Sequence, residues 1–195
     1  MPLARPSDER YTYSDYLAWP EEERWELIDG EAFAMTPAPT TLHARLVLRL
    51  GHQLEAALAG HRCTPFVAPV DVVLSDDTVV QPDVFVVCDR SKIRQAGVFG
   101  PPDLVVEVLS PSTGLRDRRA KRDLYERHGV REYLLVEPEA RYAERLSLGA
   151  DGAYGRGDLF GPDEVLVLAS LGDLELRLSE VFEVLAPAGE ASGAA

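Results

Sequence analysis

Membrane-spanning and secretory features are absent from this sequence of 195 residues. No apolar run approaches the roughly 20 residues that a transmembrane helix needs. The first eleven residues carry charges but no apolar segment of the kind found in signal peptides. These absences predict a cytoplasmic protein that has no contact with a membrane. The hydrophobic content of 46% is ample for a globular core.

Cysteine and histidine are scarce, which argues against metal sites built from these side chains. The two cysteines, Cys63 and Cys88, have neither metal-ligand spacing nor a partner pattern. We therefore expect two separate thiols in a reducing compartment. His52, His61 and His128 form no ligand spacing with one another, so a zinc site is not expected.

Positive charge is in short supply, with 20 basic residues against 33 acidic ones and a net charge of −13. This balance argues against a general nucleic-acid coat protein. The distribution is uneven, because residues 90–131 hold ten basic and five acidic residues, a net +5 that leaves −18 for the rest. The basic stretch fits either contact with an anionic partner or a solvated helix face.

The length predicts one domain, over residues 13–185, between a flexible N-terminus at 1–12 and a disordered tail at 186–195. Helices are expected over 13–19 with Ser14 as N-cap, over 40–59, from Ser112 or Thr113 to 128, and over 178–185. A hairpin is expected over 25–33, and strands over 62–67, 70–74 and 79–81 in a meander, then over 84–87, 104–109, 132–137, 142–148 at an edge, 165–168 and 174–176. The order predicts an α/β (α+β) fold, a mixed β-sheet core flanked by helices.

Two of the expected central strands carry an acid where apolar residues dominate. Glu107 interrupts the run Leu104–Leu109, and Asp83 precedes the run Val84–Val87. Strands of this composition are covered on both faces, and a buried charge there is costly unless it is paired or holds a metal ion. These two carboxylates are therefore the first candidates for a functional site.

Lys121 is the third candidate, because the pattern of the helix that follows Glu107 turns it toward the core. On a helical wheel it shares one arc with Leu124, Tyr125 and His128. A helix that folds back onto the sheet would bring Lys121 level with Glu107, since both lie about 10 Å from the connecting loop. The geometry fits both a structural Glu–Lys ion pair and a catalytic lysine.

Two carboxylates on neighbouring strands with a lysine nearby form a minimal arrangement for metal-assisted phosphodiester hydrolysis. The acids Asp83 and Glu107 would hold Mg²⁺, which prefers oxygen ligands and retains several waters. The metal would polarise the phosphate and activate water. Lys121 would stabilise developing charge or help to position and deprotonate the water.

Six segments of the chain, taken in order, resemble the Uma-type putative restriction endonuclease family of the PD-(D/E)xK nuclease superfamily. The resemblance extends from about Tyr13 to Phe182. The segments are Trp25–Glu31, Ala68–Val72, Val80–Val84, Pro102–Ser112, Lys121–Tyr125 and Gly129–Tyr133. Their combination and order are specific, whereas a lone Pro-Asp pair would carry no weight.

The resemblance implies a restriction-endonuclease-like core and a hydrolase, a Mg²⁺-dependent endonuclease that cleaves DNA and in which Mn²⁺ can substitute. By position, Asp83 matches the first acid and Glu107 the second. The superfamily places a lysine two residues after the second acid, where this chain has Leu109. In the Uma-type pattern a lysine on the next helix takes its place, which here is Lys121. The resemblance also permits a homodimer, which would present two basic stretches to one duplex.

Five further polar residues are weaker candidates. Glu26 is either a third acid near the metal or an ordinary hairpin residue. His43 lies in the apolar arc of its helix and either approaches the phosphate or is a satisfied core histidine. Asp71 is expected to be structural or to lie behind the site, and Gln81 to line it. Tyr125 is expected to be a core tyrosine.

Two other functions are compatible with the same residues. The first is a non-catalytic module of this fold that binds nucleic acid or protein, with Glu107 and Lys121 as a structural pair. The second is a hydrolase of small phosphate esters. Fold alone does not decide among them, and the sequence defines neither a recognition sequence nor the form of DNA.

Overall fold

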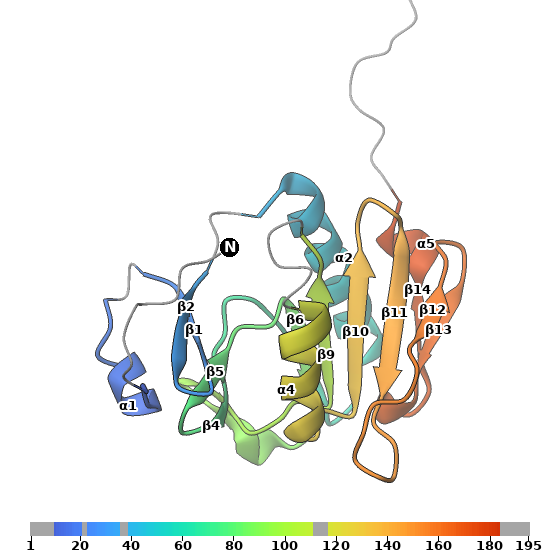
Figure 1. The fold of residues 1–195 in the computed structure, drawn as a ribbon. Coiled ribbons are helices and arrows are strands. Elements are labelled where there is room, and N and C mark those ends of the chain that lie inside the picture. Colours follow the sequence, from blue (N-terminus) through green and yellow to red (C-terminus); the bar gives the residue numbers. More distant parts are fainter. Residues whose placement is uncertain (1–9, 21–22, 36–38, 111–116, 184–195) are drawn as a thin grey trace, which may run out of the picture.

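The structure is a computed structural model that describes residues 10–20, 23–35, 39–110 and 117–183. Two six-stranded sheets and one two-stranded sheet are packed with helices into the predicted α+β arrangement (Figure 1). The predicted tail and residues 1–9 of the predicted flexible N-terminus lie outside the described residues. No helix in the described part of the chain is both long and apolar enough to span a membrane.

The central sheet has the strand order β12-β11-β10-β9-β6-β3. Its inner strands β6, β9 and β10 are almost wholly buried, as their valine- and leucine-rich sequences predict. Only β9 and β10 pair in parallel, and β11 is not at the edge as expected, because β12 pairs with its outer side. The bounds are β3 Thr64–Val67, β6 Val84–Val87, β9 Leu104–Val108, β10 Glu132–Glu137, β11 Tyr142–Ser147 and β12 Asp158–Phe160.

The second sheet has the order β2-β1-β5-β4-β8-β7 and contains the expected hairpin. Asp29 and Gly30 form its turn with φ angles of 51° and 76°, a conformation that explains the glycine. The predicted meander is confirmed for β4 and β5, which pair antiparallel, but is wrong for β3, which pairs with β6 in the central sheet instead of β4. The bounds are β1 Trp25–Ile28, β2 Glu31–Ala34, β4 Val72–Ser75, β5 Thr78–Val80, β7 Ile93–Arg94 and β8 Gly97–Phe99.

Helices cover the central sheet on both faces (Figure 1). One face packs on α2 (Thr41–Ala57), α5 (Leu178–Val181) and the sheet of β13 (Val165–Leu168) and β14 (Leu174–Arg177). The other packs on α4 (Arg122–Arg127) and on the inner side of the second sheet. Three short 3-10 or π turns complete the elements: η1 Arg90–Lys92, η2 Asp117–Lys121 and η3 Ala169–Leu171.

The helix ends agree in part with the sequence. The Thr40 hydroxyl accepts the His43 N–H and so caps α2, in agreement with the expected start of this helix at residue 40. The first helix, α1 (Tyr13–Tyr16), is capped by Thr12 in a capping box, so Ser14 is not its N-cap. The proposed caps Ser112 and Thr113 lie outside the described residues.

The prediction of two separate thiols is wrong, because Cys63 and Cys88 form a disulfide. The register of β3 and β6 places them together: Thr64 pairs with Val87, and the two cysteines are the next opposed pair. Pairing between strands 20 residues apart could not be read from the cysteine spacing.

Reduction of this disulfide is expected to lower the free energy of unfolding by about 3 kcal/mol. The bond closes a loop of 25 residues and removes chain entropy from the unfolded state. Urea unfolding with and without a reductant measures the difference, and a Cys63→Ala/Cys88→Ala variant that does not respond to the reductant is the control. Identical midpoints for the oxidised and reduced wild type would contradict the prediction.

Candidate active site

The two large sheets meet at the segment that leads from β5 to β6. Residues 81–83 leave the second sheet after Val80 and enter the central sheet at Val84. Glu26 comes to this junction from β1 of the second sheet, and Glu107 from β9 of the central sheet. Both acids are buried, which for carboxylates requires partners.

Lys121 joins the two sheets by contacting both acids. Its Nζ lies 2.8 Å from Glu107 Oε1 and 2.9 Å from Glu26 Oε1. The side chains of lysine and the two acids are only 4%, 5% and 0% exposed. Charge-assisted bonds at this depth are strong because water screens them little. The predicted contact between Lys121 and Glu107 is present, and Glu26, a weaker candidate, is equally close.

Tyr125 also reaches this cluster, although the sequence places it only in the core. It is fully buried, and its hydroxyl donates to Glu107 Oε1 at 2.9 Å. Lys121 and Tyr125 are four residues apart, which puts them on one side of the helix. The sequence did indicate this role, because a core tyrosine on the same helix face as the lysine needs a hydrogen-bond partner for its hydroxyl.

Replacing Tyr125 with Phe is expected to destabilise the protein by about 1.5–3 kcal/mol, the range for hydrogen bonds to charged groups. The change removes one donor from a buried carboxylate and keeps the ring. Chemical denaturation measures the loss. Tyr13→Phe, at a half-buried position of α1, is the matched control. A Tyr125→Phe variant as stable as wild type would show that the bond contributes nothing.

Asp83 lies next to Glu107 across the central sheet. The β6–β9 register pairs Val84 with Val106, so Asp83 is opposite Glu107 one step beyond the ladder. Its Oδ2 accepts the Val108 N–H at 2.8 Å and lies 3.2 Å from His43 Nε2. The side chain is 20% exposed, in contrast to the buried glutamates. His43 therefore contacts a candidate acid of the site.

A polar network lies behind Glu26. The Gln81 N–H donates to Glu26 Oε1 at 3.3 Å, and its side-chain Nε2 donates to Asp71 Oδ1 at 2.8 Å. The Tyr16 hydroxyl donates to the same Asp71 oxygen at 2.9 Å. Burial raises the pKa of Tyr16, and the Asp71 carboxylate raises it further, so the hydroxyl stays protonated. This network fixes Gln81 and, through it, one oxygen of Glu26.

The described basic residues of the stretch 90–131 are spread over several elements and do not form a single exposed face. Several of its arginines are paired with acids: Arg118 with Glu144, Arg127 with Asp29 and Arg131 with Asp103. Arg94 belongs to β7 of the second sheet, where its guanidinium lies over the Phe99 ring. Much of the positive charge predicted from sequence is therefore locally compensated.

The oxygen donors of the site are of the kind that suits Mg²⁺. Within the described residues, no group of three or more His, Cys, Asp and Glu side chains is arranged to hold a metal ion. Asp83 and Glu107 are only two carboxylates, and Mg²⁺ characteristically uses one or two while keeping several waters. With Glu26 and Lys121, the cluster has three carboxylates and one ammonium, a formal charge of −2 that a divalent cation would balance.

The chain matches the Uma2 family, described as "Putative restriction endonuclease", over residues 13–179. The chain belongs to this family. Its matched region contains Glu26, His43, Asp83, Glu107 and Lys121. Family membership therefore covers every candidate site residue, although it assigns a role to none of them.

Two further proteins are similar to this chain, one in sequence and one in structure. "Uncharacterized protein slr1290" of Synechocystis sp. is 33% identical over 126 residues, which are 63% of this chain and 66% of that protein. The crystal structure of a "putative nuclease belonging to DUF820" from Anabaena variabilis has a TM-score of 0.72 at 19% identity and covers 88% of this chain and 97% of its own. At this identity the second comparison shows a shared fold, that of a protein described as a nuclease.

Proposed function

We propose that this protein is a metal-dependent endonuclease that hydrolyses phosphodiester bonds of DNA. One observation carries the proposal: Lys121 lies between the buried carboxylates Glu26 and Glu107 of two sheets, and the partly exposed Asp83 is opposite Glu107 in the strand register. A purely structural ion pair needs one acid for one lysine. Two acids on one lysine, with a third acid on the neighbouring strand, leave negative charge in excess, which a cation is suited to balance.

In this proposal each residue has a distinct task. Asp83 and Glu107 would hold Mg²⁺, with Mn²⁺ as a substitute. When bound, the metal supplies Lewis acidity that polarises the phosphodiester and activates water. Lys121 stabilises negative charge that develops at the phosphate, in a site where burial strengthens its effect. Tyr125 orients the Glu107 carboxylate.

His43 and Glu26 have supporting tasks. His43 contacts Asp83 Oδ2, the oxygen that also accepts the Val108 N–H, and so holds the rotamer of this carboxylate. Glu26, on β1 of the second sheet, holds the Lys121 ammonium in addition to Glu107 on β9. Without Glu26, the position of the ammonium would depend on Glu107 alone. Both residues therefore position the groups that contact substrate and metal.

A second function, a non-catalytic module of the same fold, is favoured by the burial of Lys121. Its Nζ already has two carboxylate partners at hydrogen-bond distance, a geometry that a structural cluster would also produce. In that function the acids bind no metal. Metal binding therefore separates the two functions more directly than stability does.

The experiment is calorimetric titration of Mg²⁺ and Mn²⁺ into the wild type, the Asp83→Ala variant and the Glu107→Ala variant, each with and without a short DNA duplex. Binding that both substitutions abolish supports the nuclease, and a cleavage assay on the same duplex then follows. Asp163→Ala, which removes an exposed aspartate from a loop, is the matched control. Wild type that binds no metal in either titration would favour the non-catalytic module.

A further inference from the structure

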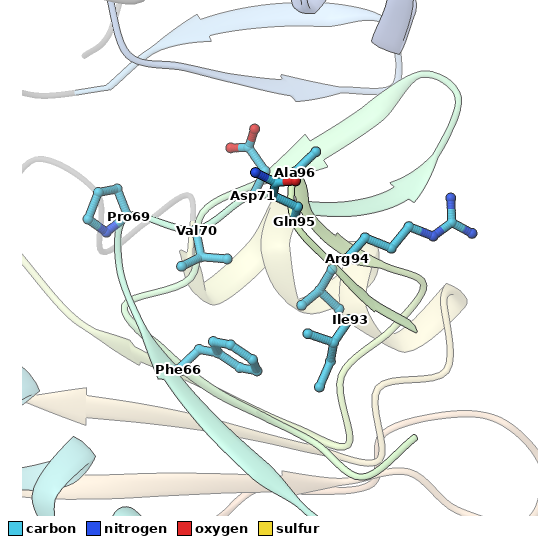
Figure 2. Close-up of a pocket in the computed structure, with 10 residues that line it drawn as sticks. Phe66, Pro69, Val70, Asp71, Ile93, Arg94, Gln95 and Ala96 are labelled. Carbon is cyan, nitrogen blue, oxygen red and sulfur yellow. The ribbon is translucent and has the colours of Figure 1, made fainter. Parts of the chain in front are cut away.

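A pocket of about 400 Å³ lies beside the site, between the end of β3 and the β7–β8 hairpin (Figure 2). This size is near the small end of the roughly 300–1,000 Å³ typical of small-molecule sites. Apolar and polar side chains both line it. The lining residues are Phe66, Pro69, Val70, Asp71, Ile93, Arg94, Gln95, Ala96, Gly97 and Val98.

The pocket opens on the same face of the central sheet as Glu107. Phe66 pairs with Phe85, and Phe85 pairs with Val105, so these three residues form a row across three strands. Glu107 follows Val105 by two residues and so points to the same face. The row packs in the cluster that contains Tyr125. The aromatic wall of the pocket and the candidate catalytic acid therefore lie on one side of the sheet.

Two hydrogen-bonded links connect the pocket wall to the acids of the site. Ala68, between two lining residues, donates its N–H to the backbone oxygen of Asp83 at 3.0 Å. Asp71, itself a lining residue, accepts from Gln81, whose N–H donates to Glu26. A backbone hydrogen bond thus links the lining segment to Asp83, and Gln81 links the lining residue Asp71 to Glu26.

The chemistry of the pocket suits a planar ring. Phe66 stacks on Phe85 with ring centroids 5.2 Å apart and an interplanar angle of 18°, which holds its ring in a fixed plane. Val70, Ile93 and Val98 supply the apolar surface around it. Arg94 also contributes to the lining, but its guanidinium lies over Phe99 and points away from the pocket (Figure 2).

Resting on the proposed function, we propose that this pocket binds one base of the DNA strand held at the site, unstacked from its neighbours. Every base presents an aromatic face, so stacking on Phe66 would tolerate different sequences. Removing a base from the stack is easiest in single-stranded or distorted DNA, which makes such DNA the preferred ligand.

The test measures binding of a short fluorescent single-stranded DNA by anisotropy at low salt, with EDTA present to prevent cleavage. A set of versions of this DNA each lacks the base at one position. For the wild type, we expect one abasic position to weaken binding roughly tenfold. Ala96→Trp, which fills the pocket from an exposed lining position, and Phe66→Leu, which removes the ring, are expected to abolish this difference.

Arg90→Gln is the matched control, because Arg90 is exposed in the same basic stretch but does not line the pocket. It is expected to preserve the dependence on the abasic position. A wild type with no such dependence, or an Ala96→Trp variant that retains it, overturns the assignment. Cleavage of the same DNA with Mg²⁺ is scored separately. A wild type that shows the dependence but never cleaves overturns the nuclease and leaves the pocket standing.

Discussion

A Glu107→Gln variant is expected to lose about 10³-fold of Mg²⁺-dependent DNA cleavage. The amide keeps the shape of the side chain but removes the charge that would hold the metal at β9. Metal coordination contributes several kcal/mol of charge stabilisation in the transition state, and each 1.36 kcal/mol is tenfold in rate. Initial rates on supercoiled and linear DNA measure the loss, with Mn²⁺ as a second metal.

The stability of the same variant distinguishes a catalytic acid from a structural one. Because Glu26 and Glu107 share Lys121, loss of one negative charge leaves a balanced buried pair. We therefore expect the metal-free Glu107→Gln variant to be at least as stable as wild type. Glu139→Gln, at an exposed turn position after β10, is the matched control for both readouts. Undiminished cleavage by Glu107→Gln would refute the role of this residue, and a large loss of stability would favour the structural pair.

The position of Lys121 could be predicted from sequence because it depends on local periodicity. Leu124 and Tyr125 mark the buried side of their helix, and both are fully buried in the structure. The wheel assumed a regular α-helix, whereas residues 117–121 form a π-helix. The contact with Glu107 is still made, because the α-helix that follows, α4, keeps Leu124 and Tyr125 on its buried side.

Pairing between strands that are distant in the chain could not be predicted from the sequence. Glu26 reaches the site because β1 pairs with β5, which brings a hairpin far from Glu107 in sequence to the junction of the sheets. The disulfide arises in the same way from the β3–β6 register. Neither pairing has a local pattern of its own. The strands themselves were visible, but the division of those strands between two sheets was not.

A Lys121→Met variant is expected to be less stable than wild type by about 3–5 kcal/mol, the cost of leaving a buried charge without its partner. Methionine retains most of the volume and helix propensity of lysine, so packing and local structure change little. The loss comes from Glu26 and Glu107, which remain buried and face each other without the ammonium between them. Urea unfolding measures the difference at neutral pH.

Two further variants assign this loss to the carboxylates. Lys92→Met changes the other lysine of the chain, which is half-buried and donates to Pro101 O, and should cost far less. Adding Glu107→Gln to Lys121→Met removes one of the two uncompensated charges and should restore part of the stability. If Lys121→Met costs no more than Lys92→Met, the ammonium does not hold the two acids together. If the double variant recovers stability, the loss in Lys121→Met comes from the carboxylates that lack the ammonium.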